Sequence, residues 1–265
     1  MRSSTAGNGT LRSDYKLMEA ISIKNLHKNF RLSHEKYGSI KGLILSFKKA
    51  RYEELHALKG ISLSIPAGET VAVIGRNGSG KSTLLGIMAR VYKPTSGEVV
   101  MNGRVSALLE LGAGFHPDLT GIENIYLNAS ILGLSRKEVD KCIDEIINFA
   151  ELEHFIDAPI RTYSAGMTMR LGFSIAIQVN PDILLVDEVL AVGDENFQQK
   201  CFDKVHEFQR MGKTIVFVSH DLEAVRKVAT RVIWLHQGDI RADGDVKTVL
   251  DAYLDASTNQ AVCRE

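Results

Sequence analysis

The chain has few cysteines and no excess of charge of either sign. Its three cysteines, Cys142, Cys201 and Cys263, stand far apart in 265 residues, and none belongs to a CxxC pair. This spacing excludes a disulfide framework, gives no support to a zinc site and fits a reducing compartment. The 32 basic and 32 acidic residues cancel, so no overall positive field argues for nucleic acid as a partner.

Long apolar segments are also missing. No apolar run reaches the roughly 20 residues that cross a bilayer, and residues 1–18 contain no hydrophobic segment of the signal-peptide kind. We therefore expect a soluble chain with a flexible, polar tail over 1–18 and a flexible, polar end over 255–265. The length allows one large domain with a substantial core, which we place at 19–254.

Short apolar runs predict the strands of an α/β protein. Residues 71–74, 183–186 and 215–218 are continuous apolar runs separated by helical stretches, which is typical of parallel strands covered on both faces. Residues 21–26 and 58–65 instead alternate apolar and polar side chains, and they predict a half-buried antiparallel layer at the edge.

A helical subdomain is predicted inside this α/β core, over about residues 117–180. Ser135 and Glu138 form a capping box, which is a start signal for a helix. Apolar residues at helical spacing follow from Val139 to Ala150.

A glycine-rich sequence lies directly between an apolar strand and a helical stretch. It fits the pattern GxxxxGK[ST] and consists of Gly75, Arg76, Asn77, Gly78, Ser79, Gly80, Lys81, Ser82 and Thr83. The glycines allow successive backbone N–H groups to face a phosphate, and the following helix start adds positive potential. In this pattern Lys81 reaches the β- and γ-phosphates of ATP, and the Ser82 hydroxyl ligates Mg²⁺.

Acidic residues and a histidine follow two of the predicted parallel strands. Asp187 and Glu188 end the run 183–186, at the sheet edge where α/β proteins bind ligands. We expect Asp187 to hold Mg²⁺ and Glu188 to polarise the attacking water, although such a pair without a phosphate loop would more often cap a helix. His220 ends the run 215–218 at the same edge, where it can contact the γ-phosphate and support Glu188, or have the structural role more common for a lone histidine.

The order of these elements resembles the nucleotide-binding subunit of ABC transporters, from about residue 21 to 253. The segment 163–167, Tyr-Ser-Ala-Gly-Met, is similar to a diverged form of the family's LSGGQ signature. The resemblance implies that Ser164 and Gly166 bind a phosphate of the ATP held by the opposite subunit, at a helix start. Taken alone, Ser164 would be interpreted as a helix N-cap.

The resemblance assigns roles to three further positions. Phe30 stands where an aromatic ring stacks on adenine, and Tyr52 and His56 are alternatives for that role. Asp194 is the acidic residue of a loop that communicates across the dimer. Glu110 stands where the family has a glutamine that links Mg²⁺ to the membrane subunit, and its metal contact stays open because a carboxylate ligates a metal but cannot donate as an amide does.

Residues 111–117, 163–167 and 187–194 together resemble a narrower branch, which exports lipid-linked polysaccharides of the O-antigen, capsule or teichoic-acid type. The branch implies an α/β fold with a P-loop NTPase core, a mostly parallel sheet, an antiparallel edge layer and an inserted helical subdomain. It also implies ATP and Mg²⁺ as ligands, ATP hydrolysis in a homodimer, and a lipid-linked glycan as substrate. An integral membrane permease would hold the chain at the cytoplasmic face of the membrane.

Two other function classes fit the sequence less well. A soluble ABC ATPase that acts on nucleic acid or the ribosome typically has a coiled coil or paired cassettes, which are not seen here, and the neutral charge gives no excess for a phosphate backbone. A regulatory nucleotide binder without turnover is disfavoured by Glu188 and His220.

An extra segment, about residues 34–54, lies between the two predicted edge strands. Its apolar stripe at helical spacing consists of Ile40, Leu43, Ile44 and Phe47, and its cations are Lys36, Lys41, Lys48, Lys49 and Arg51. Such a basic amphipathic helix either packs on its own domain or lies at a membrane interface or an anionic lipid headgroup. The resemblance favours coupling to the membrane.

Overall fold

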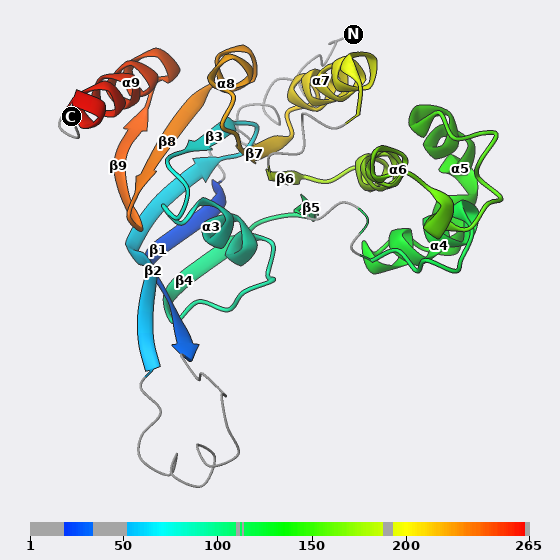
Figure 1. Ribbon diagram of the computed structural model, residues 1–265, viewed down its shortest axis with the longest axis horizontal. Coiled ribbons are helices and arrows are strands. Elements are labelled where there is room, and N and C mark those ends of the chain that lie inside the picture. Colours follow the sequence, from blue (N-terminus) through cyan, green and yellow to red (C-terminus); the bar gives the residue numbers. More distant parts are fainter. Residues whose placement is uncertain (1–18, 34–51, 110–111, 113, 188–192, 263–265) are drawn as a thin grey trace, which may run out of the picture.

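The computed structural model describes residues 19–33, 52–109, 112, 114–187 and 193–262 (Figure 1). The tail expected at 1–18 lies outside the described residues, as does the part of the predicted amphipathic helix at 34–51. Glu110 and Glu188 also lie outside them. In the described part of the chain, no helix combines the length and the apolar character needed to cross a bilayer.

Two β-sheets form the frame of the domain (Figure 1). In the smaller sheet, β1 (Glu19–Ser33) pairs antiparallel with β2 (Tyr52–Pro66) and β4 (Ser96–Met101). The larger sheet has the order β5-β6-β7-β3-β8-β9. Its strands are β3 (Thr70–Ile74), β5 (Val105–Leu108), β6 (Ile183–Asp187), β7 (Thr214–Val218), β8 (Arg231–His236) and β9 (Asp239–Gly244). Strands β5 to β8 run parallel and only β9 is antiparallel, so the predicted α/β class with a mostly parallel sheet is confirmed.

The edge strands are longer than the sequence predicted. Residues 52–54, which were assigned to the end of the amphipathic helix, lie in β2, so that part of the prediction is wrong. The backbone of this segment pairs with the end of β1, where Arg31 lies opposite Glu54 and forms an ion pair of 3.8 Å with it. These residues are extended because they pair with β1. Their own sequence therefore carries no alternating apolar pattern that would predict a strand.

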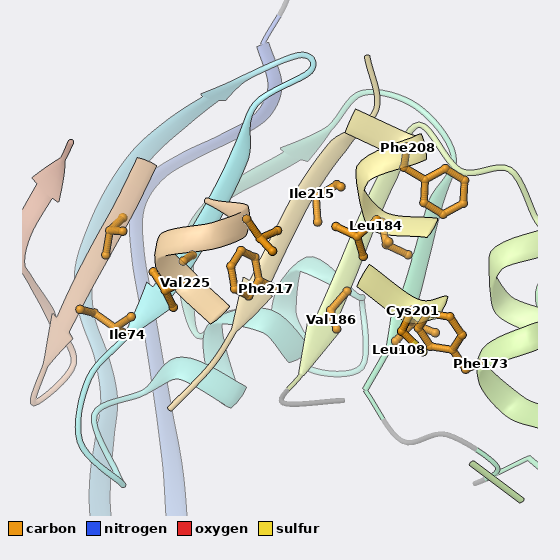
Figure 2. Packing of buried hydrophobic residues seen from close by; sticks show 14 of the residues in the cluster. Ile74, Leu108, Phe173, Leu184, Val186, Cys201, Phe208, Ile215, Phe217 and Val225 are labelled. Atoms are coloured by element: carbon orange, nitrogen blue, oxygen red, sulfur yellow. The ribbon is translucent and has the colours of Figure 1, made fainter. Parts of the chain in front are cut away.

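The central strands of the larger sheet, β3, β6, β7 and β8, are buried on both faces. Alternate residues pack with α7 (Glu195–Arg210), α8 (Leu222–Val228) and α9 (Val246–Val262). Among them are Ile74, Leu184, Val186, Ile215 and Phe217, which are labelled in Figure 2. The intervening residues Val71, Val73, Leu185, Val216 and Val218 pack with α3 (Lys81–Met88) and the antiparallel sheet. This double coverage explains why the strands are continuous apolar runs.

Three helices form a separate hydrophobic core beyond the β5 side of the sheet (Figure 1). They are α4 (Gly121–Ile131), α5 (Arg136–Ala150) and α6 (Ala165–Gln178), with the short 3₁₀ turn η1 (Ile160–Thr162) before α6. At the start of α5, the Glu138 carboxylate accepts hydrogen bonds from the amide (2.7 Å) and hydroxyl (2.6 Å) of Ser135. The predicted capping box is therefore present, and a second one at Thr120 and Glu123 was missed.

The C-terminal helix corrects another prediction. The sequence predicted a flexible end from Asp255, but α9 continues as helix to Val262. The Tyr253 ring meets the ring of Trp234 edge-on at 5.4 Å, and Ala256 packs against the same core. One apolar face is enough to pack this helix on the sheet. Because the segment is polar on average, its composition alone does not reveal that face.

Arg231, at the start of β8, connects the two sheets. Its Nε and Nη2 donate to the two carboxylate oxygens of Asp243 in β9, at 2.6 and 2.7 Å. Its Nη1 donates to Glu69, just before β3, at 3.1 Å and to the carbonyl of Ser64 in β2 at 3.0 Å. The hydrogen bonds to Asp243, and then the nearby carboxylates, raise the pKa of Arg231 above its ordinary value. This forked geometry is specific to arginine.

We predict that Arg231→Met lowers the free energy of unfolding by about 2 kcal/mol, because two carboxylates lose their shared cation in a site where the Arg231 side chain is only 22% exposed. The matched control is Arg31→Met, which removes the exposed pair with Glu54 and should cost under about 0.5 kcal/mol. Urea unfolding followed by circular dichroism measures both. Equal costs for the two variants would contradict the role of Arg231.

Candidate nucleotide site

The register of the larger sheet brings three functional segments to one edge. Val218 of β7 lies opposite Val73 of β3 on one side and opposite Asp187 of β6 on the other. The glycine-rich loop after β3, the Asp187 carboxylate and the residues after β7 therefore leave the sheet together. This is the carboxyl edge, where parallel α/β sheets bind ligands.

The glycine-rich loop passes between the two sheets at two close approaches. Gly75 and Gly80 have φ angles of +148° and +108°, which L side chains rarely adopt. A Cβ on Gly75 would lie 2.3 Å from the carbonyl oxygen of Leu235 in β8, and one on Gly80 would lie 2.7 Å from the carbonyl oxygen of Ala57 in β2. Only glycine fits at both positions. The two glycines therefore allow the tight loop that phosphate binding requires.

Lys81 places its ammonium inside this loop. It is the first residue of α3 and is 5% exposed. Its Nζ donates to the carbonyl oxygens of Gly75 at 2.9 Å and of Arg76 at 3.1 Å. The cation is thus held beside the exposed tip of the loop, where an anionic ligand would find it.

The other loop residues divide into exposed and buried groups. Arg76, Asn77, Gly78 and Ser82 are exposed, Thr83 is half-buried and Ser79 is buried. Among the described residues, the Ser79 hydroxyl has no hydrogen-bond partner. The exposed hydroxyl of Ser82 stands on the first turn of α3, which packs against β6 and so against the strand that ends in Asp187. A hydroxyl and a carboxylate are oxygen donors of the kind that Mg²⁺ takes, so these residues fit the ion.

His220 is exposed after β7, in a turn with fixed geometry. The hydroxyl of Ser219 accepts a hydrogen bond from the amide of Asp221 at 3.0 Å, and the Asp221 carboxylate caps α8. The turn therefore sets His220 at the carboxyl edge. Its predicted pairing with Glu188 stays a prediction, since Glu188 lies outside the described residues.

Ser164 and Gly166 lie apart from the loop within one chain. Ser164 is the exposed N-cap of α6, and its hydroxyl accepts from the amide of Met167 at 3.2 Å. Among the described residues, a Cβ on Gly166 would meet only the Ser164 hydroxyl, at 3.9 Å, so this part of the chain leaves the helix start open. In Figure 1, strands β5 and β6 separate α6 from α3. Within the chain, Ser164 therefore has the hydrogen bonding of a helix N-cap. Its contact with a phosphate of the nucleotide held by a second subunit stays a prediction.

The aromatic candidates lie on the smaller sheet. Phe30 is half-buried in β1, opposite Leu55 of β2, and its ring meets that of Tyr92 edge-on at 5.6 Å. The ring of His56 is hydrogen-bonded to the side chain of Asn29 at 3.0 Å. Tyr92 was not singled out from the sequence, where an aromatic residue after a helix carries no signal of its own.

Asp194 has a local role in the structure. It is the exposed N-cap of α7, and its carboxylate accepts from the amide of Phe197 at 3.0 Å. Communication across a dimer, which the resemblance implies for this residue, stays a prediction.

Comparisons with known proteins agree with this geometry. The profile of the family described as "ABC transporter" matches residues 58–191. The chain is 49% identical over 240 residues to the "O-antigen export system ATP-binding protein RfbB" of Klebsiella pneumoniae, covering 89% of this chain and 98% of that protein. It is 46% identical over 233 residues to the "Teichoic acids export ATP-binding protein TagH" of Listeria innocua, covering 88% of this chain and 69% of that protein.

A solved structure has the same fold. The ATP-binding cassette MJ0796, as a dimer in a post-hydrolysis state bound to ADP and Pi, superposes with a TM-score of 0.70 at 26% identity, covering 85% of this chain and 98% of that one. The glycine-rich loop, the strand order and the near-complete coverage of the Klebsiella pneumoniae relative lead to one conclusion. The chain belongs to the ABC transporter family and carries its ATP-binding domain.

Proposed function

We propose that the chain is the ATP-hydrolysing subunit of an exporter of lipid-linked polysaccharide, of the O-antigen or teichoic-acid type, that works with a separate membrane permease. The observation that carries this proposal is the similarity to an O-antigen export ATP-binding protein over nearly the full length of both chains. As the family implies, the chain binds nucleotide and acts as an ATPase. Its place in the cell would be the cytoplasmic face of the membrane, reached through the permease.

Nucleotide binding would use the glycine-rich loop and Lys81. On arrival of ATP, the ammonium of Lys81 would exchange the carbonyl oxygens of Gly75 and Arg76 for oxygens of the β- and γ-phosphates. Ser82 and Asp187 would hold Mg²⁺, which when bound neutralises charge on the phosphates. Contact of Glu110 with the same metal is a further part of this proposal.

The chemical step would need a base and an opposite subunit. Glu188 would take the proton of the attacking water, and His220 would contact the γ-phosphate from the neighbouring strand, as the register of Asp187 against Val218 supports. Ser164 and Gly166 of a second copy would close over the same ATP, and the open start of α6 leaves room for this contact.

The permease would contact the apolar face of α4. Leu127 and Ile131 on this helix are 37% and 65% exposed. A Cβ on Gly114 would lie 3.4 Å from Ile131, so the face adjoins a residue that follows Glu110 closely in the sequence. Apolar side chains that gather on one exposed face are typical of an interaction surface. The segment 34–51, outside the described residues, is proposed to lie at the membrane interface.

We expect Glu188→Gln to bind ATP, lose turnover by about 10²–10⁴-fold and accumulate as a dimer, because the water loses its base after the two halves have closed. Phosphate release and size-exclusion chromatography with ATP measure these effects. The matched control is Glu153→Gln in the helical part, which should hydrolyse ATP at the rate of the unaltered chain. Turnover retained in Glu188→Gln would remove Glu188 from its role.

A second variant tests the shared site. Ser164→Arg should abolish turnover and spare ATP binding, since the proposed phosphate contact belongs to the partner's nucleotide. Ser130→Arg, an exposed serine on α4, is the control and should leave the ATPase rate of the isolated subunit unchanged. If Ser164→Arg weakened ATP binding to monomers, Ser164 would belong to the local pocket instead.

The double variant Leu127→Ser/Ile131→Ser should keep the basal ATPase rate and abolish export of glycan in cells that contain the permease, because it removes the apolar contact without touching the nucleotide site. Met211→Ser replaces an equally accessible apolar residue, 57% exposed, at the end of α7 and should export normally. Unimpaired export by the double variant would rule out α4 as the docking face.

A further inference from the structure

We propose that Tyr92 is a positioning residue for the base of the nucleotide: it fixes the ring of Phe30 and ties it to the helix that carries Lys81. The inference rests on the proposed ATPase function and on adenine stacking against Phe30. It adds a residue that neither the sequence pattern nor the comparisons single out.

The Tyr92 ring packs against Gly86 of α3. A Cβ on Gly86 would lie 2.7 and 2.8 Å from the Cδ2 and Cε2 atoms of the Tyr92 ring, so this ring occupies the space that any larger residue at Gly86 would need. The amides of Val91 and Tyr92 both donate to the carbonyl oxygen of Gly86, at 2.8 and 3.1 Å. Because α3 begins at Lys81, the place of the Tyr92 ring is set relative to the phosphate loop.

The Tyr92 ring also contacts Phe30. The two rings meet edge to face, at 5.6 Å and with an interplanar angle of 86°. The Nζ of Lys28 lies 4.8 Å from the centre of the Phe30 ring and 5.9 Å from that of Tyr92, and it donates to the carbonyl of Lys93 at 3.0 Å. Edge-to-face and cation–π contacts are directional, so this arrangement defines one orientation of the Phe30 ring.

The aromatic pair stands beside the phosphate loop. Phe30 lies opposite Leu55 in β2, two residues before Ala57, whose carbonyl oxygen approaches Gly80 of the loop. Phe30 is half-buried and Tyr92 is 41% exposed, so the pair keeps an accessible aromatic surface. Aromatic side chains bind bases by stacking. A base stacked on Phe30 would then sit at a fixed place relative to phosphates held in the loop.

This arrangement predicts an effect on the base alone. Tyr92→Ala should raise the Kd for ADP about 3- to 10-fold, which corresponds to the loss of one edge-to-face pair. The Kd for pyrophosphate, which has no base, should not change. Tyr92→Phe keeps the ring and should bind ADP like the unaltered chain. Tyr92→Leu fills the space over Gly86 without a ring, so it should show the Tyr92→Ala loss even if Tyr92→Ala itself fails to fold.

The test is isothermal titration calorimetry of the full chain with ADP and with pyrophosphate, neither of which is turned over. It includes Phe30→Ala, Tyr92→Leu and the double variant, with Phe155→Ala as the control for an exposed aromatic residue distant from the loop. If Tyr92 acts through Phe30, the double variant should bind ADP no more weakly than Phe30→Ala alone.

Three results would overturn the proposal. Unchanged ADP affinity in Tyr92→Leu would mean that Tyr92 only covers Gly86. An equal loss for pyrophosphate would mean that it acts through α3 and the loop, and additive losses in the double variant would mean that it acts independently of Phe30. The expected losses in a chain that supports no glycan export would uphold the role of Tyr92 and contradict the proposed exporter function instead.

Discussion

Burial of the larger sheet on both faces is the constraint on which the rest of the structure depends. Because every residue of β3 and β7 is buried, the side chains within these strands pack against helices and cannot serve a ligand. The polar residues that could bind a ligand therefore lie at the strand ends. The parallel register brings those ends into one row, where the glycine-rich loop, Asp187 and His220 leave the sheet together. The site is thus a consequence of how the core is packed.

The sequence predicted the features that have a local cause. The strands of the parallel sheet, the glycine-rich loop and the capping box at Ser135 all follow from residues adjacent in the chain, and the structure contains each of them. The features that it missed depend on partners distant in the sequence. Residues 52–54 are strand because β1 lies beside them, and α9 continues to Val262 because Trp234 offers it a surface.

The candidate site shows the same division. The phosphate loop could be predicted from the spacing of its glycines, since each glycine meets a requirement of the local backbone conformation. Tyr92 could not be found, because its contact with Phe30 joins residues 62 positions apart, one in β1 and one in the connection after α3. The roles of Glu110 and Glu188 rest on resemblance to the family and on their order in the chain. Contacts of Ser164 with a second subunit concern an assembly, which the pattern of one chain does not encode.

The close approaches of Gly75 and Gly80 connect the phosphate loop to both sheets. The loop touches the carbonyl oxygen of Leu235 in one sheet and that of Ala57 in the other, so a ligand that orders the loop acts on both sheets at once. By mass action, a ligand at 100 times its Kd stabilises a folded protein by about 2.7 kcal/mol if it does not bind the unfolded chain. Nucleotide held in this loop would therefore protect the folded domain against unfolding and against proteolysis of the unfolded chain.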